Sequence, residues 1–308
     1  MSEPSGSDLP PAEPLLAAAG LSRAFGQVRA VDDVSFTLRE GGSLGIVGGS
    51  GSGKTTTARI VVGLERADAG EVRLRGRARS TGAGTRGRAA RLARAREVQM
   101  VFQDPYLSLD PRTSVERVLR ETLRLHFPDR DPAPRIAELL DQVGLGTRFA
   151  DALPRALSGG QRQRVAIARA LAVEPAVLVL DEAVAALDVS VQAQILNLLA
   201  DIREQTPIGY LFITHDLGVV RCVTDEVLVM HHGRVVESGA TADVLAAPQH
   251  PYTRLLLDSV PRPGWDPARI AAARQELSSA RTVPPTEPLP RTQPLPRTQT
   301  PTRTQEIR

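Results

Sequence analysis

A glycine-rich segment from residue 48 to residue 56 carries the residues best suited to bind phosphate, among them Lys54, the only lysine in the chain. It has the spacing G-x-x-x-x-G-K-T and follows the apolar run 44–47. In such a loop, backbone N–H groups and the start of the next helix bind phosphate oxygens, and a compact ammonium fits where a planar guanidinium does not. A flexible Gly/Ser turn is the alternative, but both flanks fit a strand–loop–helix unit. The segment predicts a nucleoside triphosphate site, with Lys54 also catalytic, formed by Gly48, Gly49, Ser50, Gly51, Ser52, Gly53, Lys54, Thr55 and Thr56.

Two carboxylates, Asp181 and Glu182, follow the apolar run 177–180. At the end of such a strand, Asp181 can hold a Mg²⁺ ion shared with Thr55, because Mg²⁺ prefers oxygen ligands. Glu182 is then placed as the base for an attacking water, or as the group that positions it. Paired acids at a strand end can also be a solvated helix cap. Downstream of a phosphate loop, the hydrolytic interpretation is favoured.

Apolar runs of strand length alternate with helical segments over residues 13–262. Strands are predicted at 44–47, 98–102, 177–180, 210–214 and 226–231. A late hairpin turns at 231–234. This alternation indicates an α/β domain around a largely parallel sheet.

Strand signals vanish between residues 113 and 171, where helical patterns replace them. A capping box from Thr113 to Glu116 predicts a helix over 115–125, and a second helix is predicted around 136–140. Ser158 and Gln161 form another capping box before an apolar-patterned helix that ends at Leu171. We therefore expect an α-helical subdomain inserted between strands of the core.

Composition limits the possible classes of protein. The 308 residues are 42% apolar, which is enough for a core, and a single cysteine, Cys222, excludes a disulfide framework and a multi-cysteine metal site. The start of the chain is acidic, unlike a secretory signal, and no run reaches the roughly 18 apolar residues of a membrane helix. We therefore expect a soluble, cytoplasmic chain. Residues 1–12 and 263–308 are expected to be disordered, with a PxxP-type ligand in the tail as the alternative.

Nine arginines lie between residues 73 and 96, although the net charge of the chain is only +3. A patch that binds nucleic acid or a membrane surface is one interpretation. The stretch contains no aromatic residue for base stacking, and glycines interrupt it at Gly82, Gly84 and Gly87. A solvated loop is therefore favoured, and no nucleic-acid partner is expected.

The segment Leu157-Ser158-Gly159-Gly160-Gln161 identifies a family. Its capping box alone does not explain the paired glycines, which let a phosphate approach the helix start. The segment resembles the signature of the ATP-binding cassette (ABC) family, in which the signature of one subunit completes the ATP site of the other. The resemblance implies an α/β P-loop NTPase core with a largely parallel sheet, an antiparallel β portion and the inserted helical subdomain. It assigns Ser158, Gly159, Gly160 and Gln161 to nucleotide binding.

The same resemblance implies roles for four single residues. Gln103 matches the Q-loop glutamine, which contacts Mg²⁺ or the attacking water. Asp188 matches the D-loop residue at the dimer interface, and His215 matches the catalytic switch histidine at the γ-phosphate. Phe25 matches the aromatic residue that stacks on adenine.

Three further segments resemble the oligopeptide, dipeptide and nickel importers within this family. They are residues 102–112, 188–196 and 250–256. Two positions depart from that subfamily. Ala183 stands where proline is usual, and Gly49 stands where glutamate is usual.

The resemblance implies an ATPase that uses ATP and Mg²⁺ at the cytoplasmic face of the membrane. Its expected partners are a second ATPase subunit, identical or paralogous, two transmembrane permease subunits and, indirectly, an extracytoplasmic solute-binding protein. The alternatives are an exporter ATPase, a soluble ABC protein of translation or DNA repair, and a non-hydrolysing half-site. A single cassette without sustained heptads, and intact Glu182 and His215, disfavour the last two. Peptides, nickel, sugars and glycosides remain open as solutes.

Overall fold

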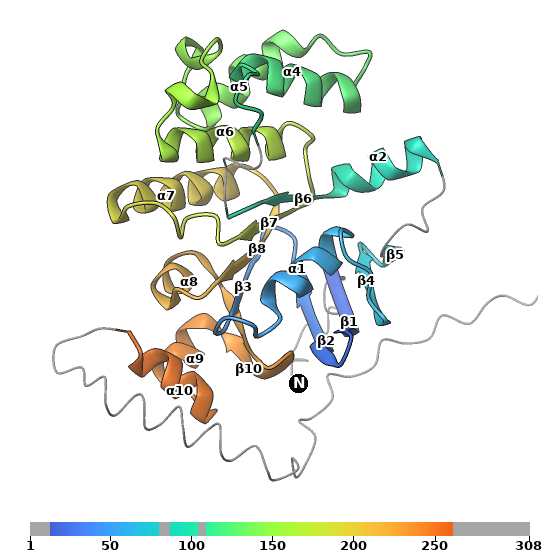
Figure 1. Cartoon of the computed structure of the whole chain (residues 1–308), viewed down its shortest axis with the longest axis vertical. Helices are drawn as coiled ribbons and strands as arrows, with labels where there is room; N and C mark the ends of the chain where they lie inside the picture. The colour runs from blue at the N-terminus through green and yellow to red at the C-terminus, as the bar shows by residue number, and fades with distance from the viewer. Residues whose placement is uncertain (1–12, 80–86, 104–108, 261–308) are drawn as a thin grey trace, which may run out of the picture. The chain divides into compact units, whose positions relative to one another are not determined.

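A six-stranded sheet organises the part of the chain that this computed structural model describes, residues 13–79, 87–103 and 109–260 (Figure 1). The strand order is β10-β9-β3-β8-β7-β6. All neighbours pair in parallel except β10, which forms the predicted hairpin with β9. The strands are β3 (Ser43–Val47), β6 (Val98–Val101), β7 (Val177–Asp181), β8 (Gly209–Thr214), β9 (Glu226–His231) and β10 (Arg234–Ala240). Every residue of β3, β7 and β8 is buried, as expected for a parallel sheet covered on both faces.

An antiparallel sheet forms the second β portion, with the strand order β2-β1-β4-β5. Its strands are β1 (Leu16–Phe25), β2 (Val28–Leu38), β4 (Ala69–Leu74) and β5 (Arg77–Arg79). An antiparallel portion was predicted, but none of these strands was located. Register shifts in the β1–β2 pair, beginning between Ala18 and Leu21, break the alternation by which such strands are found.

Two hydrophobic clusters cover opposite faces of the parallel sheet. Leu178 and Leu180 of β7 face a cluster that includes the helical subdomain, whereas Val177 and Val179 face α1 (Lys54–Val62) and the antiparallel sheet. Side chains alternate along a strand, so a single buried strand contributes to both clusters. The remaining helices that flank the sheet are α7 (Val189–Gln205), α8 (Leu217–Val223), α9 (Thr241–Ala246) and α10 (Pro251–Asp258).

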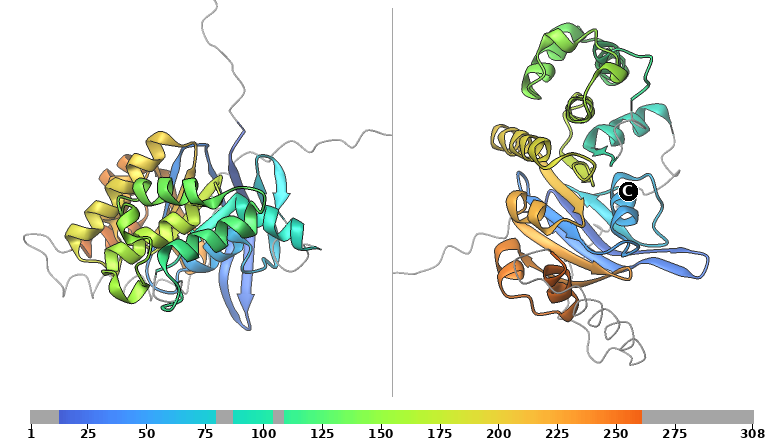
Figure 2. Two further views of the ribbon diagram at one scale, coloured as in Figure 1. Left: turned by 90° about the horizontal axis from the view of Figure 1, so that it is seen from above. Right: turned by 60° about the vertical axis from the view of Figure 1, so that its left-hand side comes forward.

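The helical subdomain consists of α4 (Val115–His126), α5 (Pro132–Gln142) and α6 (Gly159–Leu171), with two short 3₁₀ turns between α5 and α6. The three helices contact one another and form one group in Figure 2. The capping box predicted from Thr113 is wrong. The N-cap of α4 is Ser114, whose side chain accepts from the N–H of Arg117, so the position three residues later is an arginine instead of the glutamate that a capping box needs.

The solvated loop predicted for the arginine-rich stretch is also wrong in part. Residues 73–79 belong largely to β4 and β5, and Arg88–Glu97 form a helix, α2, that buries none of its residues. Arginine and alanine favour helix, and the glycines of this stretch end before residue 88. The Arg96 guanidinium lies 4.4 Å from the centre of the Phe127 ring. Residues 80–86 lie outside the described residues.

The chain divides into two units, residues 1–263 and 264–308. The segments predicted to be disordered, 1–12 and 263–308, lie outside the described residues. Among the helices that the structure describes, none combines the length and apolar character needed to cross a bilayer.

Candidate nucleotide-binding site

The phosphate-loop sequence lies between β3 and α1, as the strand–loop–helix pattern predicts. Two of its glycines are required by close backbone contacts. A Cβ atom at Gly48 would lie 2.2 Å from the carbonyl oxygen of Met230, and one at Gly53 would lie 2.1 Å from that of Ala30. Gly53 also has φ +100°, in the left-handed region that side chains disfavour. The surrounding backbone therefore fixes the loop, and only glycine fits at these two positions.

Lys54 begins α1 and points back into this loop. Its side chain is buried, with the residue 6% exposed, and its Nζ donates to the carbonyl oxygens of Gly48 at 2.8 Å and Gly49 at 2.9 Å. Burial lowers the pKa of the Lys54 ammonium, while the carboxylates Glu182 and Asp181 act in the opposite direction. The loop thus holds a buried cationic group against two of its own carbonyl oxygens.

The groups around Asp181 fit a metal ion and phosphate oxygens. Asp181 ends β7, and the Thr55 hydroxyl donates to its Oδ1 at 3.2 Å. Burial raises the pKa of the Asp181 carboxyl, so a cation beside it would stabilise its ionised form. Among the described residues, the buried Ser52 hydroxyl has no hydrogen-bond partner. A buried, unsatisfied hydroxyl in this loop can be satisfied by a phosphate oxygen.

Glu182 and His215 form a second polar pair, directly after β7 and β8. Glu182 has φ +47°, an uncommon conformation for a residue with a side chain, and its N–H donates to the carbonyl oxygen of Ile213 at 2.8 Å. His215 Nδ1 lies 3.1 Å from Glu182 Oε1. Strained backbone that is held in place by neighbouring strands is typical of functional sites.

The carboxyl ends of four adjacent parallel strands therefore carry the predicted chemistry. The phosphate loop follows β3, and His215 follows β8. Asp181 is the last residue of β7, Glu182 comes directly after it, and Gln103 lies just after β6. Ligands of open α/β sheets bind at this edge. The structure thus brings together these residues, which the sequence predicted from separate motifs.

Phe25, Ser158 and Asp188 lie on other elements. Phe25 ends β1, is 47% exposed and has the Arg23 guanidinium 4.8 Å from its ring centre. Asp188 is the N-cap of α7, where its side chain accepts from the Val191 N–H and the Ser190 hydroxyl. These bonds lower the pKa of the Asp188 carboxyl. Asp188 therefore has a structural role within its own chain, and its role at a dimer interface stays a prediction.

Ser158 is the exposed N-cap of α6, and its capping box with Gln161 is confirmed. The glycines that follow differ from each other. A Cβ atom at Gly160 would lie 2.3 Å from Val191 Cγ1, whereas one at Gly159 would make only an ordinary contact, 3.4 Å from Leu187 Cδ2. Sequence reasoning assigned both glycines to phosphate approach. The structure adds a packing reason for Gly160, which lets α6 lie close to α7.

We expect Gly160→Ala to destabilise the fold by about 1–3 kcal/mol, because the added methyl group overpacks against Val191. The melting temperature should fall by about 3–8 °C. Gly159→Ala is the matched control and should leave it unchanged or raise it, since alanine favours helix. In a Val191→Ala background, adding Gly160→Ala should cost little. An equal loss with and without Val191 would contradict this packing account.

Sequence reasoning missed one contact of the phosphate loop. The N–H of Gly49 donates to the Tyr252 hydroxyl at 2.8 Å, although the two residues are 203 positions apart. The segment 250–256 that contains Tyr252 was noted only as a subfamily resemblance. That resemblance was the one signal in the sequence that pointed to this segment.

A phosphate loop at the carboxyl edge of a parallel sheet, next to a strand that ends in an aspartate, defines a P-loop nucleoside triphosphatase. Residues 31–185 match the family described as ABC transporter. Residues 236–285 match a second family, described as the oligopeptide/dipeptide transporter C-terminal region. The chain belongs to the ABC transporter family, which implies nucleotide binding.

Individual proteins agree with this assignment. The chain is 49% identical over 250 residues to the oligopeptide transport ATP-binding protein OppD of Mycobacterium tuberculosis, covering 81% of this chain and 40% of that protein. It is 47% identical over 243 residues to the glutathione import ATP-binding protein GsiA of Escherichia coli K12, covering 78% of this chain and 38% of that protein. The chain thus spans about 40% of the length of these relatives.

A solved structure of similar fold is an ATP-binding cassette in a dimeric, post-hydrolysis state with ADP and Pi. It superposes with a TM-score of 0.64 at 28% identity and covers 73% of this chain and 98% of that chain. The predicted α/β fold with its P-loop NTPase core is confirmed, as is the resemblance to the ABC family.

Proposed function

We propose that the chain is the ATP-hydrolysing subunit of an ABC importer, and that it couples ATP binding and hydrolysis to uptake of peptides or a similar small solute. The observation that carries the hydrolytic part is the edge of the parallel sheet, where Lys54 in its loop accompanies Asp181, Glu182 and His215. The import part is supported by the C-terminal match over 236–285 and by relatives named for oligopeptide transport and glutathione import.

In this proposal the loop residues 48–56 bind the triphosphate through backbone N–H groups, the Lys54 ammonium and the Ser52 hydroxyl. Thr55, Asp181 and Gln103 would hold Mg²⁺, which would withdraw negative charge from the phosphates. Their side-chain oxygens are ligands that suit Mg²⁺. Phe25 stacks on the adenine ring.

Glu182 accepts the proton of the attacking water or positions that water, and His215 lies at the γ-phosphate, where it also orients Glu182. The 3.1 Å contact between His215 Nδ1 and Glu182 Oε1 supports this division of roles. The backbone bond of Glu182 to Ile213 fixes the main chain at the end of β7, and the contact with His215 orients the carboxylate before the water arrives. The charged groups are set around the phosphates in advance, which lowers the cost of reorganisation during the reaction.

The second half of each ATP site comes from a second ATPase subunit, identical or paralogous. Ser158, Gly159, Gly160 and Gln161 present the start of α6 to the γ-phosphate of the opposing subunit, with Asp188 at the interface. The exposed position of Ser158 supports this assignment. Residues 13–262 would form the nucleotide-binding domain, with the helical subdomain at about 113–171.

Two transmembrane permease subunits would bind this ATPase at the cytoplasmic face of the membrane and receive solute from an extracytoplasmic binding protein. An exporter ATPase, or a soluble ABC ATPase not linked to transport, is the alternative. The match over 236–285 favours the importer. Co-purification of permease subunits that accept solute from a binding protein would distinguish the importer from both alternatives.

We expect Ser158→Arg to reduce ATP hydrolysis at least tenfold while leaving ATP binding to the isolated chain within about threefold of the wild type, because the bulky cation blocks only the opposing site. Nucleotide affinity and phosphate release should be measured on one preparation. Thr147→Arg, an exposed position of the helical subdomain, is the matched control and should leave both unchanged. If affinity falls together with hydrolysis, Ser158 belongs to the pocket of its own chain and the two-subunit site is wrong.

A further inference from the structure

We propose that Tyr252 is a positioning residue of the phosphate loop, whose hydroxyl fixes the Gly48–Gly49 peptide group and thereby raises the affinity for ATP. The inference rests on the proposed function, because it takes the loop to be the ATP site. It assigns a role in that site to the C-terminal region matched over 236–285, which lies outside the family match over 31–185.

Two side chains hold opposite ends of one peptide group. The carbonyl oxygen of Gly48 accepts from Lys54 Nζ at 2.8 Å, and the N–H of Gly49, in the same peptide unit, donates to the Tyr252 hydroxyl at 2.8 Å. Glycine lies on both sides of this unit, so the backbone has little intrinsic preference for one orientation. The two contacts therefore fix the plane of the peptide and with it the carbonyl that orients Lys54.

Contacts within the chain hold Tyr252 itself in place. It is 7% exposed, and its ring stacks on the ring of His231, with 3.8 Å between centroids and 21° between planes. Its N–H donates to His250 Nδ1 at 3.1 Å, and the N–H of His250 donates to Glu237 Oε2 at 3.1 Å. β9, which carries His231, and β10, which carries Glu237, thus aim the hydroxyl at the loop.

Gly49 provides the space that this contact needs. A Cβ atom at residue 49 would lie 3.1 Å from the Tyr252 hydroxyl, tighter than most such contacts, so the hydroxyl would have to shift slightly away from the Gly49 N–H. Residues 49 and 252 therefore act as a pair, and a change at one should alter the effect of a change at the other.

The test is Tyr252→Phe, which removes the hydroxyl and keeps the ring that stacks on His231. We expect a three- to tenfold rise in the dissociation constant for ATP, measured by competition with a fluorescent ATP analogue, and a matching rise in KM. The kcat should stay within twofold of the wild type, because Glu182 and His215 are untouched. A merely structural loss would instead lower kcat through the folded fraction and leave KM unchanged.

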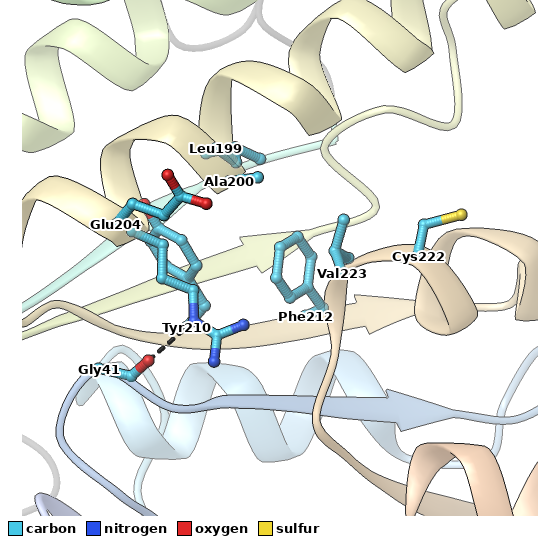
Figure 3. Close-up of a pocket in the computed structure, with 9 residues that line it drawn as sticks. Gly41, Leu199, Ala200, Glu204, Tyr210, Phe212, Cys222 and Val223 are labelled. Carbon is cyan, nitrogen blue, oxygen red and sulfur yellow. Dashed lines mark hydrogen bonds between the residues drawn. The ribbon is translucent and has the colours of Figure 1, made fainter.

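Tyr210→Phe is the matched control. Tyr210 lies at the amino end of β8, paired with Ser43, whereas the phosphate loop follows the other end of β3. It lines a separate cavity of about 340 Å³ with Phe212, Leu199 and Cys222 (Figure 3). Among the described residues its hydroxyl has no hydrogen-bond partner. The control should therefore leave ATP affinity unchanged.

Either of two results with the tyrosine variants would overturn the inference while leaving the proposed function intact. One is an ATP affinity of Tyr252→Phe equal to that of a wild-type chain that binds ATP. The other is an equal weakening in Tyr210→Phe. Gly49→Ala provides the second variant. It should weaken ATP binding in the wild-type chain and have little further effect in Tyr252→Phe, so strict additivity would also contradict the pair. A wild-type chain that binds no ATP would overturn the proposed function, and this inference with it.

Discussion

Glu182→Gln is expected to reduce ATP hydrolysis at least a hundredfold while leaving ATP affinity within about threefold of the wild type. Glutamine keeps the size of the side chain, but it cannot accept the proton of the attacking water, a function worth about 10²–10⁴ in rate. Lys54, Thr55 and Asp181, which are proposed to hold the nucleotide and its metal, are unchanged. The variant also has one negative charge fewer beside the γ-phosphate, which favours the ATP-bound dimer.

Sizing chromatography with MgATP measures whether Glu182→Gln forms this ATP-bound dimer. Glu182→Gln should elute as a dimer that lasts for minutes, whereas the wild-type chain should return to monomer as it hydrolyses ATP. Glu174→Gln is the matched control, because Glu174 also has a positive φ, +56°, but pairs with Arg130 on the surface. It should behave as the wild type does. Near wild-type hydrolysis by Glu182→Gln would show that another group acts on the water.

Lys54→Arg is expected to lose about 100- to 1000-fold in hydrolysis, nearly as much as Lys54→Ala. The ammonium occupies a buried position between two loop carbonyl oxygens, at 2.8 and 2.9 Å. A guanidinium keeps the charge, but it is wider and planar, so it cannot enter this position without moving the glycine backbone around it. The exchange that looks conservative should therefore remove the function.

Initial rates of phosphate release should be compared at saturating MgATP, together with the melting temperature, because the structure buries Lys54. Arg59→Lys makes the reverse exchange at an exposed position of the same helix and should retain activity. An arginine variant that keeps more than about a tenth of wild-type activity, a loss under about 1.4 kcal/mol, would contradict the geometric argument.

Features fixed by local spacing could be predicted from the sequence. The loop around Lys54, the strand that ends at Asp181 and the capping box of Ser158 each depend on residues that are close in the chain. The loop and the end of β7 meet at one edge of the sheet because the strands run parallel, so this part of the candidate site could be predicted. Its chemical roles remain proposals.

Features that depend on distant neighbours could not be predicted. The bulges of the β1–β2 pair hide its strand pattern. A side chain at residue 160 would collide with Val191, and the N–H of Gly49 donates to the hydroxyl of Tyr252, which is 203 positions away in the chain. Residue spacing in a single sequence cannot predict such contacts, because the partners meet only in the folded chain.

We propose that each ATP site is shared between the phosphate loop of one subunit and the Ser158 segment of another. The most direct measurement is phosphate release by an equal mixture of Lys54→Ala and Ser158→Arg, under conditions in which the wild-type chain alone hydrolyses ATP. A dimer of the two variants contains one site with both Lys54 and Ser158 intact. The mixture should be clearly more active than the two variants measured separately. A mixture no more active than their sum would contradict it.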